Sequence, residues 1–91
     1  MPKYMVSRTV GSTSEQEIEA TCLSAMDVLD QMPDLRWIRS YSSDVEGKIY
    51  CEYESPSVEL IFEHAHRPGT SIDKAEVVVR ELEPSMFRQA G

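Results

Sequence analysis

The sequence predicts an α+β domain in which the elements follow one another in the order strand, helix, strand, strand, helix, strand. Three observations predict this class. The spacing of apolar residues changes twice from a period of two to a helical period, glycine or proline marks the boundaries, and a short loop ending in glycine joins the two middle strands. A chain of 91 residues, 41% of them hydrophobic, has the size of one compact domain.

The first half of the chain predicts one strand and one helix. Apolar and polar side chains alternate from Tyr4 to Val10, as in a strand with one buried face. Ser14 and Glu17 then have the spacing of a capping box, which predicts the start of a helix. Its apolar face is expected to consist of Ile18, Cys22, Ala25, Met26 and Leu29. Pro33 ends this helix because proline has no amide hydrogen to donate.

The middle of the chain predicts a hairpin and a second helix. Residues 35–42 and 48–54 are rich in aromatic and β-branched residues, and the loop between them ends in glycine, so these strands should pair antiparallel. Ser55 and Pro56 are expected as the N-cap and first residue of the second helix, which should end near Arg67-Pro68-Gly69. The buried face of this helix is expected to contain Val58, Ile61, Phe62 and Ala65.

The last strand is expected from Lys74 to Leu82, so that residues 1–84 form the domain and residues 85–91 form a C-terminal tail. Right-handed crossovers then favour a ferredoxin-like sandwich, with four antiparallel strands and both helices on one face. Alternation along the second strand predicts one shared side for Leu35, Trp37, Arg39 and Tyr41. Both sheet faces therefore need cover, and we expect a second copy of the chain to form a dimeric α+β barrel-like association.

Charge and composition exclude some partners. Sixteen acidic against nine basic side chains give a formal net charge of −7, which disfavours binding to nucleic acids and to anionic membranes. The sequence contains no apolar stretch of the roughly 20 residues that a membrane span needs, and we expect a cytoplasmic protein. Cys22 and Cys51 do not form a close pair in the sequence, so two free buried thiols are expected.

Several segments together resemble a bacterial family of unknown function that is typified by a small actinobacterial nickel-binding protein. These segments are Met1 to Val6 with Arg8, Arg36 to Tyr41, Tyr50 to Pro56, and Glu63 to Ala65 ahead of Gly69. The resemblance covers nearly the whole chain and implies a ferredoxin-like homodimer that binds nickel. It carries one candidate ligand over to this chain, His64. The chain departs from the family pattern at Ser7 and His66, where glutamate and arginine are common.

Ligand chemistry gives nickel a candidate site on the predicted second helix. Nickel(II) favours imidazole nitrogen together with carboxylate or water oxygen. The candidate ligands are His64, Glu63 and His66. Glu63 and His66 share one helix face, whereas His64 and His66 lie about 200° apart around an ideal helix. Both histidines of one subunit therefore do not easily bind one ion. A site with His64 would need ligands from a strand or a partner subunit, and a site with Glu63 and His66 would be shallow and exposed to solvent. The alternative is a solvated helix face on which Glu63 pairs with Arg67.

A second hypothesis places a ligand pocket beside the sheet. Its candidate residues are Arg8, Arg39, Tyr41, Cys51 and Tyr53. Arginine holds anions, and tyrosine and histidine exchange protons. The sequence thus predicts a homodimer that binds a divalent transition metal, nickel, for storage, buffering or sensing. The alternative is a small-molecule-binding protein or a cofactor-free enzyme with a pocket near Arg39, Tyr41 and His64, and an enzyme is the less expected of these. The third possibility is a purely protein-interacting module, and without a pocket Tyr41, Tyr53 and Trp37 are expected as aromatic residues of the core or of an interface.

Overall fold

The computed structural model describes residues 1–11, 14–67 and 72–88. Its elements are β1 (Lys3–Thr9), α1 (Glu15–Leu29), β2 (Arg36–Ser43), β3 (Lys48–Glu54), α2 (Val58–His66), β4 (Lys74–Val78) and a 3-10 turn (Pro84–Met86). This order confirms the α+β arrangement predicted from the sequence. Helix α2 has Arg67 as its C-cap, the first residue of the predicted end at Arg67-Pro68-Gly69. Pro68, Gly69 and residues 89–91 of the predicted tail lie outside the described residues.

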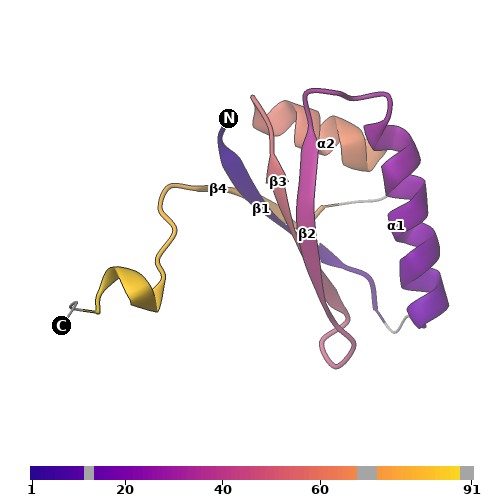
Figure 1. The fold of residues 1–91 in the computed structure, drawn as a ribbon. Coiled ribbons are helices and arrows are strands. Elements are labelled where there is room, and N and C mark those ends of the chain that lie inside the picture. The colour runs from indigo at the N-terminus through magenta and orange to yellow at the C-terminus, as the bar shows by residue number, and fades with distance from the viewer. Residues whose placement is uncertain (12–13, 68–71, 89–91) are drawn as a thin grey trace.

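The four strands form one antiparallel sheet in the order β2-β3-β1-β4. Both helices lie against the same face of this sheet, and the chain after β4 extends away from it (Figure 1). Side chains of the inner strands and of α2 form the core, together with the turn that follows α1. The buried apolar residues are Val6, Met32, Leu35, Ile49, Cys51, Tyr53, Ile61 and Ala65. No helix within the described part of the chain is long and apolar enough to cross a membrane.

A serine is the N-cap residue of both helices. The Ser14 hydroxyl accepts a hydrogen bond from the Glu17 amide at 3.1 Å, as the capping box predicted. The second helix begins later than predicted, because Ser57 is its N-cap and accepts from the Leu60 amide at 3.4 Å. Ser55 is instead fully buried, and its hydroxyl donates to the Ser57 carbonyl at 2.6 Å. Pro56 therefore precedes the helix.

A β-bulge in β2 corrects the predicted alternation of this strand. Trp37 lies opposite Tyr53 and Arg39 lies opposite Glu52, so Ile38 is the additional residue between them. An additional residue moves every later side chain of the strand to the other face of the sheet. Trp37 and Ser40 consequently face the helices, whereas Arg39 and Tyr41 face the opposite side. The four residues predicted to share one side are divided between the two faces.

Two further expectations are corrected near the C-terminal half. Strand β4 ends at Val78 and not at Leu82, because Val78 pairs with Lys3, the first residue of β1. The residue before Lys3 is Pro2, which would lie opposite Val79 and has no amide hydrogen to donate to a further ladder hydrogen bond. Phe62, predicted in the buried face of α2, is 48% exposed. Ile61, His64 and Ala65 are the buried residues of that helix.

Candidate functional site

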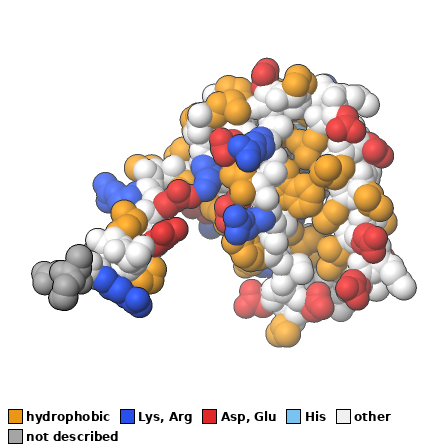
Figure 2. Space-filling view, viewed as in Figure 1, with side chains coloured by type: hydrophobic (Ala, Val, Ile, Leu, Met, Phe, Trp, Pro, Cys, Tyr) orange, Lys and Arg blue, Asp and Glu red, His pale blue; other side chains and the backbone are white. Residues whose placement is uncertain are grey.

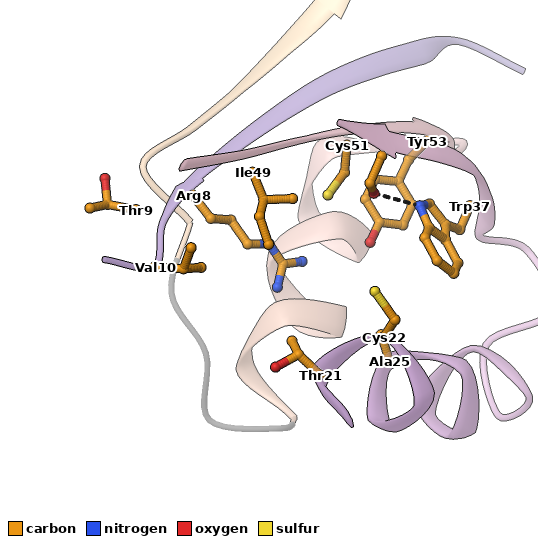
Figure 3. Close-up of a pocket in the computed structure, with 11 residues that line it drawn as sticks. Arg8, Thr9, Val10, Thr21, Cys22, Ala25, Trp37, Ile49, Cys51 and Tyr53 are labelled. Atoms are coloured by element: carbon orange, nitrogen blue, oxygen red, sulfur yellow. Dashed lines mark hydrogen bonds between the residues drawn. The ribbon is translucent and has the colours of Figure 1, made fainter. Parts of the chain in front are cut away.

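A cavity of about 260 Å³ lies between α1 and the sheet. Figure 2 shows hydrophobic side chains gathered in this region, with acidic side chains along the outer edge of α1. Its lining comes from β2, β3, the end of β1 and one face of α1. The lining residues are Arg8, Thr9, Val10, Thr21, Cys22, Ala25, Trp37, Ser40, Ile49, Cys51 and Tyr53. Figure 3 shows the sheet residues on one side of the space and the α1 residues on the other.

The cavity exists because α1 presents small side chains to the sheet. Thr21, Cys22 and Ala25 are its contributions to the lining, and no residue of α1 is buried. Larger side chains of the same helix, Leu23 and Met26, are exposed. Short side chains at the helix face leave space above the strands that a leucine or phenylalanine would fill. The first helix therefore covers the sheet without closing the core beneath it.

Arg8 supplies the charge of the cavity. It is 7% exposed and lies opposite Ile49 in the β1–β3 ladder, in line with the buried Val6. Figure 3 shows its guanidinium directed into the space between the sheet and α1. Among the described residues that line the cavity, Arg8 is basic and none is Asp or Glu. The cavity thus combines mainly apolar walls with one buried positive charge.

The buried environment of the cavity shifts the pKa values of Tyr53 and Cys51 on β3. Burial raises the pKa of the Tyr53 hydroxyl to about 12, and the charge of Arg8 and its hydrogen bond to that hydroxyl oppose the rise. Burial also raises the pKa of the Cys51 thiol, whereas a hydrogen bond with Ser40 and the charge of Arg8 lower it. Both groups therefore remain protonated at neutral pH, so Tyr53 is a hydroxyl donor and Cys51 is a poor nucleophile.

Trp37 closes the cavity near β2. Its indole Nε1 donates to the Ser40 hydroxyl at 2.9 Å, a contact that the bulge allows because it places both residues on one face. The hydrogen bond fixes the orientation of the ring, which is drawn beside Tyr53 in Figure 3. Trp37 is the single tryptophan of the chain, so its fluorescence reports on this cavity alone.

His64 lies under the neighbouring helix and packs as a core residue. It is 1% exposed, and its ring centroid is 5.7 Å from that of Tyr53. Its Nε2 is 3.2 Å from the Ala25 carbonyl oxygen, which can only accept, so Nε2 carries the proton. Burial lowers the pKa of His64; the Ala25 hydrogen bond raises it, and the charges of Arg8 and Arg67 lower it. The imidazole is therefore neutral at pH 7 and joins α2 to α1.

The structure brings together three of the five residues predicted for a ligand pocket. Arg8, Cys51 and Tyr53 line one cavity, whereas Arg39 and Tyr41 lie on the other face of the sheet. There the Tyr41 hydroxyl donates to Glu52 at 3.2 Å. The sheet separates these two residues from His64, so a pocket that joins Arg39, Tyr41 and His64 does not form.

Sequence reasoning missed the part of the lining that α1 and β2 provide. Cys22 and Ala25 were recognised as members of an apolar stripe, but the stripe alone gives no sign that they leave a space. Their small size relative to the aromatic residues opposite is the available signal. Trp37 and Ser40 depend on the bulge, for which the sequence around Ile38 gives no such signal.

The three candidate metal ligands do not converge in one chain. Glu63 and His66 are exposed on α2, and Glu63 pairs with Arg67 at 3.6 Å between Oε2 and Nη2. His64 points to the core and uses Nε2 for the Ala25 carbonyl. Within the described ranges there is no group of three or more His, Cys, Asp or Glu side chains that is able to hold a metal ion. The residues that the structure describes in a single chain therefore do not form a complete nickel site.

Comparison with known proteins places the chain in a family. The family model described as "Nickel responsive protein SCO4226-like" matches residues 4–78, from β1 to the end of β4. The chain belongs to the SCO4226-like family. The matched range contains every residue that lines the cavity and ends where β4 ends. No curated protein matches the sequence.

A solved structure supports the fold of this SCO4226-like chain. The crystal structure of SCO4226 from Streptomyces coelicolor A3(2) aligns with a TM-score of 0.78 and 17% sequence identity. The alignment covers 88% of this chain and 99% of that one. At this identity the likeness concerns the fold, in which four antiparallel strands carry both helices on one face.

Proposed function

We propose that this SCO4226-like protein binds a small organic molecule in the cavity between α1 and the sheet. The observation that carries this proposal is an apolar cavity of about 260 Å³ with a buried arginine directed into it. A cavity of about 150 Å³ admits benzene, and ligand pockets commonly start near 300 Å³. The space therefore fits a molecule with one small ring or a short branched chain.

The walls supply the two kinds of contact that such a site needs. Trp37, Ile49 and Ala25 provide apolar surface, and Arg8 and the Tyr53 hydroxyl provide convergent polar groups. Specific pockets usually combine a mostly apolar lining with a few placed polar groups. The lining has this character, and its polar groups come from two neighbouring strands of a rigid sheet.

Fluorescence of Trp37 provides the experiment. We expect cyclohexanol, which is neutral and transparent where tryptophan is excited, to change the emission of Trp37 in a saturable way. Ala25→Phe would fill the space from α1 and should abolish this change. Ala20→Phe makes the same substitution at an exposed position of α1 and should leave it intact. A titration without saturation, or an equal response from Ala25→Phe, would refute the proposal.

The family suggests a second candidate, which is nickel binding for storage, buffering or sensing. The favouring observation is that Glu63 and His66 are both exposed and one helical turn apart on α2, beside a family description that names nickel responsiveness. Two ligands are fewer than nickel(II) takes. We propose that such a site, if formed, is completed by a second copy of the chain.

Calorimetric titration of the tag-free, metal-stripped protein with nickel, zinc and copper tests this candidate. Submicromolar nickel binding that His66→Ala abolishes would support the exposed site. His64→Ala is the matched variant, because it removes an imidazole that is buried. Loss of binding in His64→Ala alone would move the site to the core, and unchanged binding in both variants would refute both histidines as ligands.

We also propose that two copies associate through the sheet face that the helices leave open. This face carries Met5, Tyr50 and Tyr41 together with acidic and basic side chains, and Met5 and Tyr50 are only partly exposed. Apolar and aromatic surface of this kind gains from a partner subunit. Sedimentation equilibrium should give a dimer for the native chain and a monomer for Tyr50→Asp. A monomeric native protein at micromolar concentration would contradict the proposal.

A further inference from the structure

We propose that the ligand of the α1 cavity is an organic anion: a compact apolar body with one carboxylate that meets Arg8. This inference rests on the proposed function, since it names the chemical class of the molecule that the same cavity takes. Four observations support it: the direction of Arg8, the absence of acidic residues in the described lining, the polar groups around Arg8, and the size of the space.

Arg8 lies inside the cavity and not on the surface of the protein. Its side chain is 7% exposed, and in Figure 3 the guanidinium points into the space among Ile49, Thr21 and the hydroxyl end of Tyr53. Guanidinium groups bind carboxylates through two parallel hydrogen bonds, which are stronger than bonds between neutral groups. A planar, fixed donor pair at the end of an apolar space suits a carboxylate attached to a small hydrocarbon.

The charge of Arg8 acts throughout the cavity. Burial is the main cause of the pKa shifts of Cys51, Tyr53 and His64, and it raises the first two and lowers the third; the charge of Arg8 acts on all three groups in the direction of a lower pKa. The described lining contains no carboxylate of the protein, so no acidic residue of the lining neutralises the charge of Arg8. Apolar walls reduce the local dielectric constant, and the attraction between Arg8 and a bound anion is correspondingly larger than it would be in water.

Arg8 and Tyr53 are the groups that would bind the carboxylate, because two other hydroxyls of the lining already make hydrogen bonds within the protein. The Thr21 hydroxyl donates to the Glu17 carbonyl at 2.9 Å, and the Ser40 hydroxyl accepts from Trp37 at 2.9 Å. Ser40 also shares a hydrogen bond with Cys51, so both hydroxyls already have partners within the protein. The protonated Tyr53 hydroxyl has a hydrogen to donate and lies beside the guanidinium, which gives an anion a second donor from the next strand.

A series of three molecules with one body tests the inference in the wild-type protein. We would measure binding of cyclohexanecarboxylate, cyclohexanecarboxamide and cyclohexylmethylamine by calorimetry at pH 7. A charge-assisted pair in place of a neutral hydrogen bond predicts that the carboxylate binds at least about tenfold more tightly than the amide. The amine should bind most weakly, because its charge has the same sign as that of Arg8.

The outcomes separate the two proposals. Equal affinity for carboxylate and amide would overturn the anion assignment and leave the cavity as a site for neutral molecules. Failure of all three molecules to bind would overturn the proposed function as well. Arg8→Met should remove the preference for carboxylate and retain amide binding, whereas Arg36→Met, which removes an exposed arginine, should keep the preference. If Arg8→Met does not fold, the wild-type series still decides.

Discussion

The two helices cover the same sheet face in different ways. Under α2, Ile61, His64 and Ala65 are buried, and the helix closes the core. Under α1 no residue is buried, and a cavity with a buried arginine remains. The longer helix thus contributes less to the core than the shorter one. One half of this face is a closed core, and the other half keeps a cavity, which we propose as the ligand site.

Truncation of a core residue under α2 should have the largest effect. Ile61→Ala removes a side chain that is 1% exposed, and we expect the free energy of unfolding to fall by about 2–5 kcal/mol. Leu23→Ala on α1, at a side chain that is 61% exposed, should change it by no more than about 0.5 kcal/mol. Urea denaturation measures both values. Similar losses for the two variants would mean that α1 packs as tightly as α2.

Alkaline titration should reveal the burial of Tyr53, which lies between the two halves. Its pKa rises from about 10 to about 12 on folding, so at intermediate pH the unfolded chain has lost a proton that the folded protein keeps. The contribution of protonated Tyr53 to the free energy of unfolding is therefore fully present below pH 10. The free energy of unfolding should fall by about 2–3 kcal/mol as the pH rises to 12. Tyr53→Phe should remove this part of the pH dependence. An unchanged slope in that variant would contradict the assignment.

Enlargement of one alanine in each helix compares the free space directly. Ala65→Leu forces a larger side chain into a filled core and should lower the free energy of unfolding by about 1–3 kcal/mol. Ala25→Leu enters the cavity and should cost less than about 1 kcal/mol or stabilise the protein. Thermal or urea denaturation of the pair gives the answer. Equal destabilisation would show that α1 leaves no usable space.

The smallest effect is expected at the exposed ion pair of α2. Glu63→Gln removes the charge that pairs with Arg67 across one helical turn. Exposed pairs of this kind contribute about 0.3–0.5 kcal/mol, so the free energy of unfolding should change by no more than that and should depend on salt. A loss above about 1 kcal/mol would assign Glu63 a structural role beyond this pair.

The order of elements was predictable because each depends on local signals. The capping serine of α1, the proline after it and the hairpin that ends in Gly47 act within a few residues. The end of β4 was not predictable in this way. Val79 and Leu82 favour a strand, but a strand needs a neighbour, and β1 has no residue before Lys3 in the ladder.

The candidate site was predictable only in part, for related reasons. The pairing of β1 with β3 is regular, so Arg8, Cys51 and Tyr53 lie on one face, as the hypothesis of a shared pocket required. The same rule failed on β2, where the additional residue Ile38 exchanged the faces of all later side chains. The α1 side of the cavity depends on tertiary distances that periodicity does not contain. The sequence thus predicted lining residues on strands whose pairing is regular. It missed those whose position depends on the bulge in β2 or on the space beneath α1.

Amide chemical shifts during titration with cyclohexanecarboxylate test the central claim most directly. We expect saturable changes at Arg8, Cys22, Ala25, Trp37 and Tyr53, which surround the cavity, and small changes on the outer side of α2 and on the open sheet face. That pattern would establish the space under α1 as a binding site for an organic anion. Changes centred on Glu63 and His66, changes confined to the open face, or no saturable changes would contradict it.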